Sequence, residues 1–305
     1  MRKKEAVACF EQAADCLPVR FRRLALTLPV ETKETVEELR LRAGRPMTLL
    51  LPEGESAPWE DVVGPEDLET VLNMVTEYSR YAAAESMRNG YLSAKGGCRI
   101  GLCGTAVMKD GGNTNLRDLS SLVIRVAREK KGVAEPLIER LLEGGRLQST
   151  LVLAPPGAGK TTLLRDLVRC LSSGGPGRRP LRVSLVDERG EIAVMVHGLP
   201  QMDIGTYTDV LDACPKAIGI PMVLRAMNPQ VIAVDEITAR EDLRAMTAAA
   251  NCGVALLATI HGANMEELTR KPLYWDLLAA KVFQKAIRIE NSGGRRTYQV
   301  EELPC

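Results

Sequence analysis

The chain has 305 residues and a formal net charge of +1, and 45% of its residues are hydrophobic while 26% are charged. This balance argues against a large basic surface for nucleic acid, and because no stretch of about 20 apolar residues could span a bilayer, we expect a cytoplasmic protein. The chain has only two histidines and no Cys-x-x-Cys pair, which argues against a zinc site. Its eight scattered cysteines indicate a reducing compartment.

The first part of the chain predicts an α+β domain over residues 1–131. A strand is expected at 47–51, and apolar residues at helical spacing predict a helix over 67–88. Glycine-rich, β-like sequence follows, with strands expected over 98–107 and 122–126. We expect this domain to be the smaller of two, since a chain of this length typically forms about two domains.

The rest of the chain predicts a linker helix over residues 132–146 and an α/β domain over 147–305. Apolar segments alternate there with helical patterns before a terminal hairpin. The strands are expected at 151–153, 183–186, 231–234 and 254–259, the helices at 161–171, 217–227 and 242–250, and the hairpin strands at 286–289 and 297–300. Continuous apolar strands between helices predict a parallel sheet that is covered on both faces.

A phosphate-binding loop is predicted at residues 154–161, where an apolar strand meets a helix. It departs from the pattern Gly-x-x-x-x-Gly-Lys-Ser/Thr only at Ala154. The helix start would turn its N–H groups to the phosphates, Lys160 would neutralise the β and γ oxygens, and the Thr161 hydroxyl would bind Mg²⁺. The predicted nucleotide-binding residues are Pro156, Gly157, Ala158, Gly159, Lys160, Thr161 and Thr162. The loop therefore predicts that the protein binds ATP and, with Mg²⁺, hydrolyses it.

Three further strand ends carry polar residues to the expected position of the γ-phosphate. Asp235 would hold Mg²⁺ through water, and Glu236 would act as the general base for the attacking water. The acidic box at 187–191 adds Glu188 as a catalytic candidate, although a solvated turn remains the alternative. His261 would contact the γ-phosphate or its water, and a purely structural histidine remains the alternative.

These motifs, in this order, resemble the secretion-superfamily ATPases of type II and type IV systems. The chain departs from that pattern where Asp235 replaces the usual glycine and where the acidic box begins Asp-Glu instead of Glu-Asp. It is more similar still to the stage III sporulation ATPases of endospore-forming bacteria. That resemblance is carried by residues 38–46, 97–104, 120–128 and 224–236 together with the motifs above.

The resemblance implies a RecA-like ATPase domain behind the N-terminal domain, assembled as a homo-hexameric ring with ATP between the two domains. Arg125 and Arg128, and less strongly Arg225, are then the candidates to reach the γ-phosphate. It also implies a mother-cell location, on the cytoplasmic side of a membrane protein of the sporulation channel complex. The ATPase would power assembly of, or transport through, the channel between mother cell and forespore.

Two other functions stay open from the sequence. A P-loop ATPase acting on nucleic acid, of the recombinase or helicase kind, is supported only by basic stretches at residues 20–23 and 178–179, and we expect no direct nucleic-acid contact. A non-hydrolytic assembly factor would bind ATP firmly with turnover near zero.

Overall fold

The computed structural model describes residues 3–77, 84–88, 90–109, 112–262, 267, 272–292 and 295–303. The chain divides into two compact units. Unit 1 comprises Met1–Glu129 and Met195–Gln201, and unit 2 comprises Lys130–Val194 and Met202–Cys305. No sequence pattern predicts that the short segment Met195–Gln201 joins unit 1. Within the described ranges, no helix combines the length and hydrophobicity that crossing a membrane requires.

Unit 1 is built on a six-stranded antiparallel sheet in the order β3-β2-β1-β6-β5-β4. Its strands are β1 (Glu38–Arg42), β2 (Thr48–Leu51), β3 (Gly54–Ser56), β4 (Tyr91–Ser93), β5 (Arg99–Lys109) and β6 (Gly112–Arg125). Its helices are α1 (Lys3–Ala14), α2 (Val19–Leu26), α3 (Val30–Thr35), α4 (Pro65–Val75) and α5 (Ala84–Arg88), with a 3-10 turn η1 at Lys95–Gly97. The short hairpin of β11 (Met195–Val196) and β12 (Leu199–Pro200) completes the unit.

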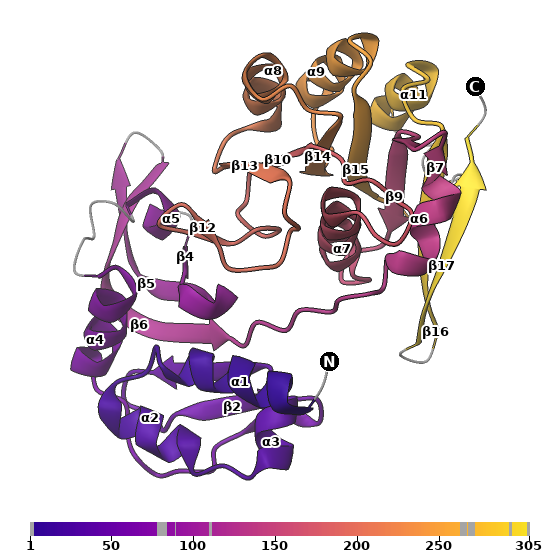
Figure 1. Ribbon diagram of the computed structural model, residues 1–305. Coiled ribbons are helices and arrows are strands. Elements are labelled where there is room, and N and C mark those ends of the chain that lie inside the picture. Colours follow the sequence, from indigo (N-terminus) through magenta and orange to yellow (C-terminus); the bar gives the residue numbers. More distant parts are fainter. Residues whose placement is uncertain are drawn as a thin grey trace. The chain divides into compact units, whose positions relative to one another are not determined.

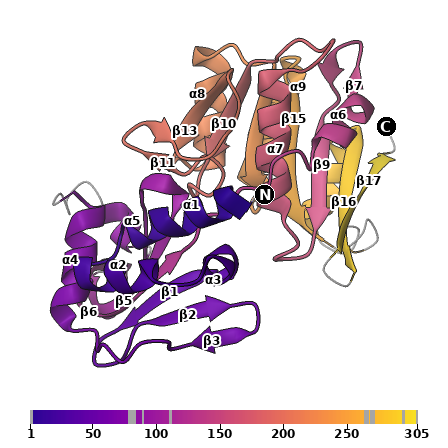
Figure 2. The same cartoon turned by 60° about the horizontal axis from the view of Figure 1, so that its bottom comes forward.

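The core of unit 1 lies between this sheet and its helices (Figure 2). Phe10 of α1, Phe21 of α2 and Leu68 of α4 are fully buried together with strand residues such as Ile100. Removing such large apolar side chains from water is the main stabilising contribution that these amphipathic helices make.

The single helix predicted over residues 67–88 is wrong. Helix α4 ends at Val75, where the Thr76 hydroxyl donates to the carbonyl of Leu72 at 2.8 Å. Glu77 then adopts a φ of 47°, which an α-helix does not allow. Helix α5 is a separate element that starts at Ala84, and residues 78–83 lie outside the described residues.

Unit 2 contains the predicted parallel sheet, in the order β13-β10-β14-β15-β9-β16-β17, with only β17 antiparallel to its neighbour. The strands are β9 (Thr150–Ala154), β10 (Val183–Asp187), β13 (Thr208–Asp212), β14 (Val231–Glu236), β15 (Ala255–His261), β16 (Lys285–Ser292) and β17 (Arg295–Glu302). The helices are α6 (Glu135–Leu141), α7 (Lys160–Ser173), α8 (Lys216–Ala226), α9 (Arg240–Asn251) and α11 (Pro272–Ala279). A small hairpin of β7 (Leu142–Glu143) and β8 (Arg146–Leu147) follows α6.

Helices cover both faces of the unit 2 sheet (Figure 1). Helix α7 packs on one face, and α8, α9 and α11 pack on the other. Leu151 and Leu153 of β9 share a core with Ile220 of α8 and Met246 of α9. All five residues of β9 are buried, which explains its continuous apolar sequence and confirms the predicted α/β architecture.

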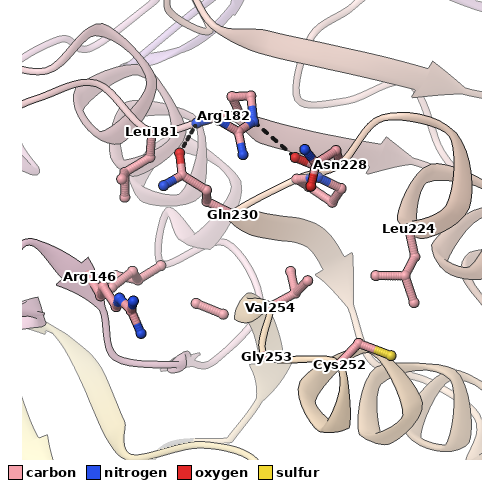
Figure 3. A pocket seen from close by; sticks show the side chains of 12 residues that line it. Arg146, Leu181, Arg182, Leu224, Asn228, Gln230, Cys252, Gly253 and Val254 are labelled. Atoms are coloured by element: carbon pink, nitrogen blue, oxygen red, sulfur yellow. Dashed lines mark hydrogen bonds between the residues drawn. The ribbon is translucent and has the colours of Figure 1, made fainter.

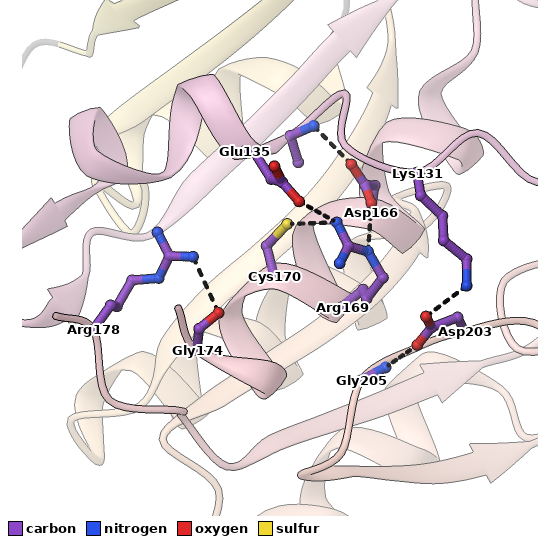
Figure 4. Close-up of polar contacts among 10 residues, drawn as sticks. Lys131, Glu135, Asp166, Arg169, Cys170, Gly174, Arg178, Asp203 and Gly205 are labelled. Carbon is purple, nitrogen blue, oxygen red and sulfur yellow. Dashed lines mark hydrogen bonds and ion pairs between the residues drawn. The ribbon is translucent and has the colours of Figure 1, made fainter. Parts of the chain in front are cut away.

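Helix α6 is fixed to α7 by a buried carboxylate (Figure 4). Asp166 accepts one hydrogen bond from the backbone N–H of Ala134 at 2.7 Å and another from the Arg169 Nε at 2.7 Å. Arg169 also pairs with Glu135 of α6 at 3.2 Å. The helix that carries the phosphate loop is thereby tied to the segment that enters unit 2.

We predict that Asp166→Ala lowers the free energy of unfolding by about 2 kcal/mol, because a buried N–H and a mostly buried guanidinium lose their acceptor. The matched control is Glu139→Ala, which removes an exposed carboxylate whose ion pair with Arg178 is 3.1 Å long. That change should stay within about 0.5 kcal/mol. Urea denaturation followed by circular dichroism measures both, and equal losses would contradict the role given to Asp166.

Candidate functional site

The loop between β9 and α7 presents, at a helix start, N–H groups that have no acceptor among the described residues. Gly157 and Gly159 adopt φ values of 74° and 103°, which favour glycine. The first intrahelical hydrogen bond comes from Leu163, and no described group accepts one from the backbone N–H groups of Lys160 or Thr161. An anion fits this arrangement, because free N–H groups and the helix dipole both favour negative charge there.

Ala154 stands where the loop pattern has glycine, and its surroundings explain why a Cβ is accommodated. It is the last residue of β9, fully buried and paired with His261 in ordinary strand register. Its carbonyl accepts hydrogen bonds from Lys160 Nζ at 2.9 Å and from the N–H of Gly262 at 3.3 Å. The residue thus belongs to the sheet, and the loop turns only after it.

The carboxyl ends of three strands bring Lys160, His261 and Glu236 together. Lys160 Nζ lies 2.6 Å from His261 Nδ1, and His261 Nε2 lies 2.7 Å from Glu236 Oε2. Arg189 reaches the same carboxylate, with Nη1 at 3.8 Å from Oε2. The parallel register that sets Glu236 beside Thr259 and His261 beside Ala154 produces this cluster.

Asp235 lies on the buried side of the same strand end. Its Oδ1 accepts a hydrogen bond from the Thr259 hydroxyl at 3.2 Å, and burial, assisted by the nearby Glu191 carboxylate, raises its pKa. Burial lowers the pKa of Lys160, while Glu236 and Asp235 oppose that shift.

The described residues contain no group of three or more His, Cys, Asp or Glu side chains that could hold a metal ion. Magnesium does not require such a group, because it commonly uses one or two carboxylates together with water and substrate phosphates. Thr161 and Asp235 would fit that pattern, with the aspartate reaching the ion through water.

The acidic box serves two different purposes. Asp187 is fully buried, and its oxygens accept hydrogen bonds from the N–H groups of Glu191 and Ile192 at 3.0 Å and of Ala193 at 2.9 Å. Burial nevertheless raises its pKa to about 6. Glu188 pairs with the buried Lys216 of α8 and is not part of the Glu236 cluster. The structure thus assigns Asp187 to holding its own loop and leaves Glu188 beside a lysine.

The three candidate arginines differ in how far their side chains are engaged. Arg128 donates to backbone carbonyls at the end of α3, to Val36 at 2.7 Å among others, and burial lowers its pKa. Arg125 stays 65% exposed and pairs with Glu38 at 3.3 Å. Arg225 is exposed on α8 and donates to the carbonyl of Pro221 at 3.1 Å. Of the two candidates in unit 1, Arg125 therefore has the more exposed guanidinium, and Arg128 the more engaged one.

Three residues near these motifs were missed by the sequence reasoning: Arg189, Lys216 and Arg296. Arg189 lies inside the acidic box, so its position was a usable signal. Lys216 and Arg296 belong to no motif. The guanidinium of Arg296 lies against the phosphate loop, 3.1 Å from the point where a Cβ on residue 159 would stand.

A pocket of about 570 Å³ lies at the opposite edge of the sheet (Figure 3). Its lining includes Arg182, Gln230 and Val254, the residues that directly precede β10, β14 and β15. Two hydrogen bonds close this edge, from Arg182 Nε to the carbonyl of Asn228 and from the Arg182 N–H to Gln230 Oε1. Ligands of parallel α/β sheets bind at the carboxyl ends of the strands, so the edge that carries the phosphate loop remains the candidate site.

The fold is similar to that of two solved ATPases. The pilus retraction motor PilT with bound ADP aligns with a TM-score of 0.63 and 15% identity, over 90% of this chain and 82% of that one. The ATPase DotB of Legionella pneumophila aligns with a TM-score of 0.58 and 14% identity, over 87% and 76%. The chain therefore has the RecA-like fold of the secretion ATPases, preceded by a smaller α+β domain, and the predicted fold class is confirmed.

The chain belongs to the family described as sporulation stage III, protein AA, whose model matches residues 8–300. It is 37% identical over 286 residues to the stage III sporulation protein AA of Bacillus subtilis (strain 168), covering 94% of this chain and 92% of that protein. The resemblance predicted from the motifs is confirmed.

The buried Asp187 predicts a pH dependence of stability. Its pKa is about 6 in the fold against an ordinary value of 3.8, so the folded state holds a proton that the unfolded state has released between these values. Its contribution to the free energy of unfolding is full at low pH and is lost as the pH rises through about 6. Asp187→Asn removes this titration and keeps one acceptor oxygen.

Urea unfolding of the wild type and Asp187→Asn, at about pH 5 and about pH 7, checks this sign. The wild type should lose stability relative to the variant between the two pH values. A difference between the two proteins that is the same at both pH values would contradict the raised pKa.

Proposed function

We propose that the protein binds ATP with Mg²⁺ and hydrolyses it at the carboxyl edge of the unit 2 sheet. The observation that carries this proposal is the line of contacts from Lys160 through His261 to Glu236. It lies beside a helix start whose first N–H groups find no acceptor in the described part of the chain. The two ATPases of similar fold support it.

Each of these residues has a definite task in hydrolysis. The N–H groups of the loop would hold the β-phosphate, and phosphate oxygens would replace the carbonyls of Ala154 and Pro155 as acceptors for Lys160. Glu236 would take a proton from the water that attacks the γ-phosphorus while the bond to the β–γ bridging oxygen breaks. His261 would hold Glu236 in place and sense the γ-phosphate. Mg²⁺ would neutralise the developing charge on the phosphates.

Two substitutions separate binding from chemistry. Lys160→Ala should weaken ATP binding and abolish phosphate release, because the positive charge beside the phosphates is lost. Glu236→Gln should keep ATP binding and lower turnover by about 10²–10⁴-fold, the usual contribution of a general base. The matched controls Lys130→Ala and Glu241→Gln change exposed residues and should leave turnover unchanged. Calorimetric binding and a phosphate-release assay give both quantities.

The alternatives predict different results in the same assays. Wild-type protein that binds ATP firmly with no turnover would favour a non-hydrolytic assembly factor. Turnover stimulated by DNA would favour a nucleic-acid ATPase, and full activity of Lys160→Ala would contradict the site itself.

At the level of the cell, we propose a secretion-type ATPase that powers assembly of, or transport through, the channel between mother cell and forespore. Family membership and the RecA-like fold support this role. The protein would act as a homo-hexameric ring on the mother-cell side, through a membrane protein of the channel complex. Arg125 would reach the γ-phosphate of a neighbouring nucleotide.

Arg125→Ala should then lower turnover by about 10³-fold or more while leaving ADP affinity unchanged, as expected for an arginine that acts on the transition state. Arg128→Ala should instead lower the melting temperature, because its guanidinium holds carbonyls within unit 1. Native mass measurement of Glu236→Gln with ATP, with and without Arg125→Ala, shows whether the ring persists. A monomer under every condition would contradict the ring.

A further inference from the structure

The C-terminal hairpin extends alongside the phosphate loop. Strand β16 pairs in parallel with β9 from Lys285 opposite Thr150 to Arg288 opposite Leu153. Strand β9 ends at the next residue, but β16 continues to Ser292 and turns back as β17. The end of the hairpin therefore passes the carboxyl edge of the sheet on the side of β9 away from β15.

Arg296, on the returning strand, lies against the loop. Its Cζ and Nη1 atoms are both 3.1 Å, and its Nε 3.4 Å, from the position that a Cβ on residue 159 would occupy. Gly159 has a φ of 103° and no side chain, so the guanidinium packs on the backbone directly before Lys160. The glycine is required twice over, by its backbone angle and by the space that Arg296 takes.

In the described part of the chain, no group forms an ion pair or a hydrogen bond with the guanidinium of Arg296. Arg288 of the same hairpin differs, because it pairs with Glu290 at 3.2 Å and Glu301 at 3.4 Å. Moreover, Arg296 lies at the start of α7, the positive end of the helix dipole, where an added cation is unfavourable. A partly buried arginine in that position is stabilised once an anion binds between it and the loop.

The positions of Glu236 and His261 indicate which phosphate of a nucleotide Arg296 would contact. Glu236 and His261, which would handle the γ-phosphate, come from β14 and β15 on one side of β9. The hairpin lies on the other side. A polyphosphate that crosses the loop with its γ end at Glu236 therefore has its α-phosphate towards the hairpin. We infer that Arg296 binds the α-phosphate of the nucleotide, a conclusion that rests on the proposed function.

The experiment compares ADP and ATP affinities of the full chain by calorimetry, with ATP measured in the Glu236→Gln background. Arg296→Ala should weaken both nucleotides by the same factor, about tenfold or more, because the α-phosphate is common to both and a charged hydrogen bond has this magnitude. Arg296→Lys should lose less, since it keeps the charge without the planar fork. Arg288→Ala is the matched control for charge removed from the hairpin and should leave both affinities unchanged.

Two results would overturn the inference. Unchanged affinity in Arg296→Ala means that the arginine does not contact the nucleotide, and a loss confined to ATP means that it faces the γ-phosphate. If Arg296→Ala also melts at a lower temperature, Arg296→Lys decides whether lost stability or a lost contact weakens binding. The lysine variant keeps the packing of a long cationic side chain. Lys160→Ala is measured in parallel: if it loses binding while both Arg296 variants keep it, only the inference fails, and if it also keeps binding, the proposed site fails.

Discussion

Parallel pairing of β9 between β15 and β16 is the constraint on which the candidate site depends. The register that pairs His261 with Ala154 sets the imidazole beside Lys160, and the register that pairs Arg288 with Leu153 carries the hairpin past the loop. Strand β9 is buried on both faces, so apolar packing on the helices above and below holds that register. A slip by one residue would turn every side chain of the strand to the other face.

Burial decides what each strand-end acid can do, although the acids look alike in the sequence. Asp187 has no exposed surface and spends its oxygens on the N–H groups of the loop that follows, so it acts as a turn-forming acceptor. Glu236 keeps 17% of its side chain exposed, and its contacts with His261 and Arg189 both use Oε2. Its other carboxylate oxygen is therefore left to accept a proton from water. Asp235 lies between these extremes: it is buried, and among the described side chains Thr259 is the one that donates a hydrogen bond to it.

The sequence predicted those features that depend on local patterns. Continuous apolar strands and the loop motif place Lys160, Glu236 and His261 at one sheet edge, because parallel strands end at the same side. The helices α1 to α3 were not predicted, since their apolar faces are short and interrupted by charges. The partners of Glu188 and the position of Arg296 could not be predicted either, because both depend on contacts between residues far apart in the chain.

The same long-range logic applies where the chain leaves unit 2 for Met195–Gln201. Val194, the last residue before that segment, has a φ of 51°, a strained conformation for a β-branched side chain. Such strain persists only where the surroundings hold the backbone on both sides. Asp187 holds the N–H of Ala193 on one side, and within unit 1 Gln201 accepts a hydrogen bond from the N–H of Gly96 at 3.0 Å. Within unit 2, the strained Val194 therefore directly follows the residue that Asp187 holds, at the end of the loop that the acidic box organises.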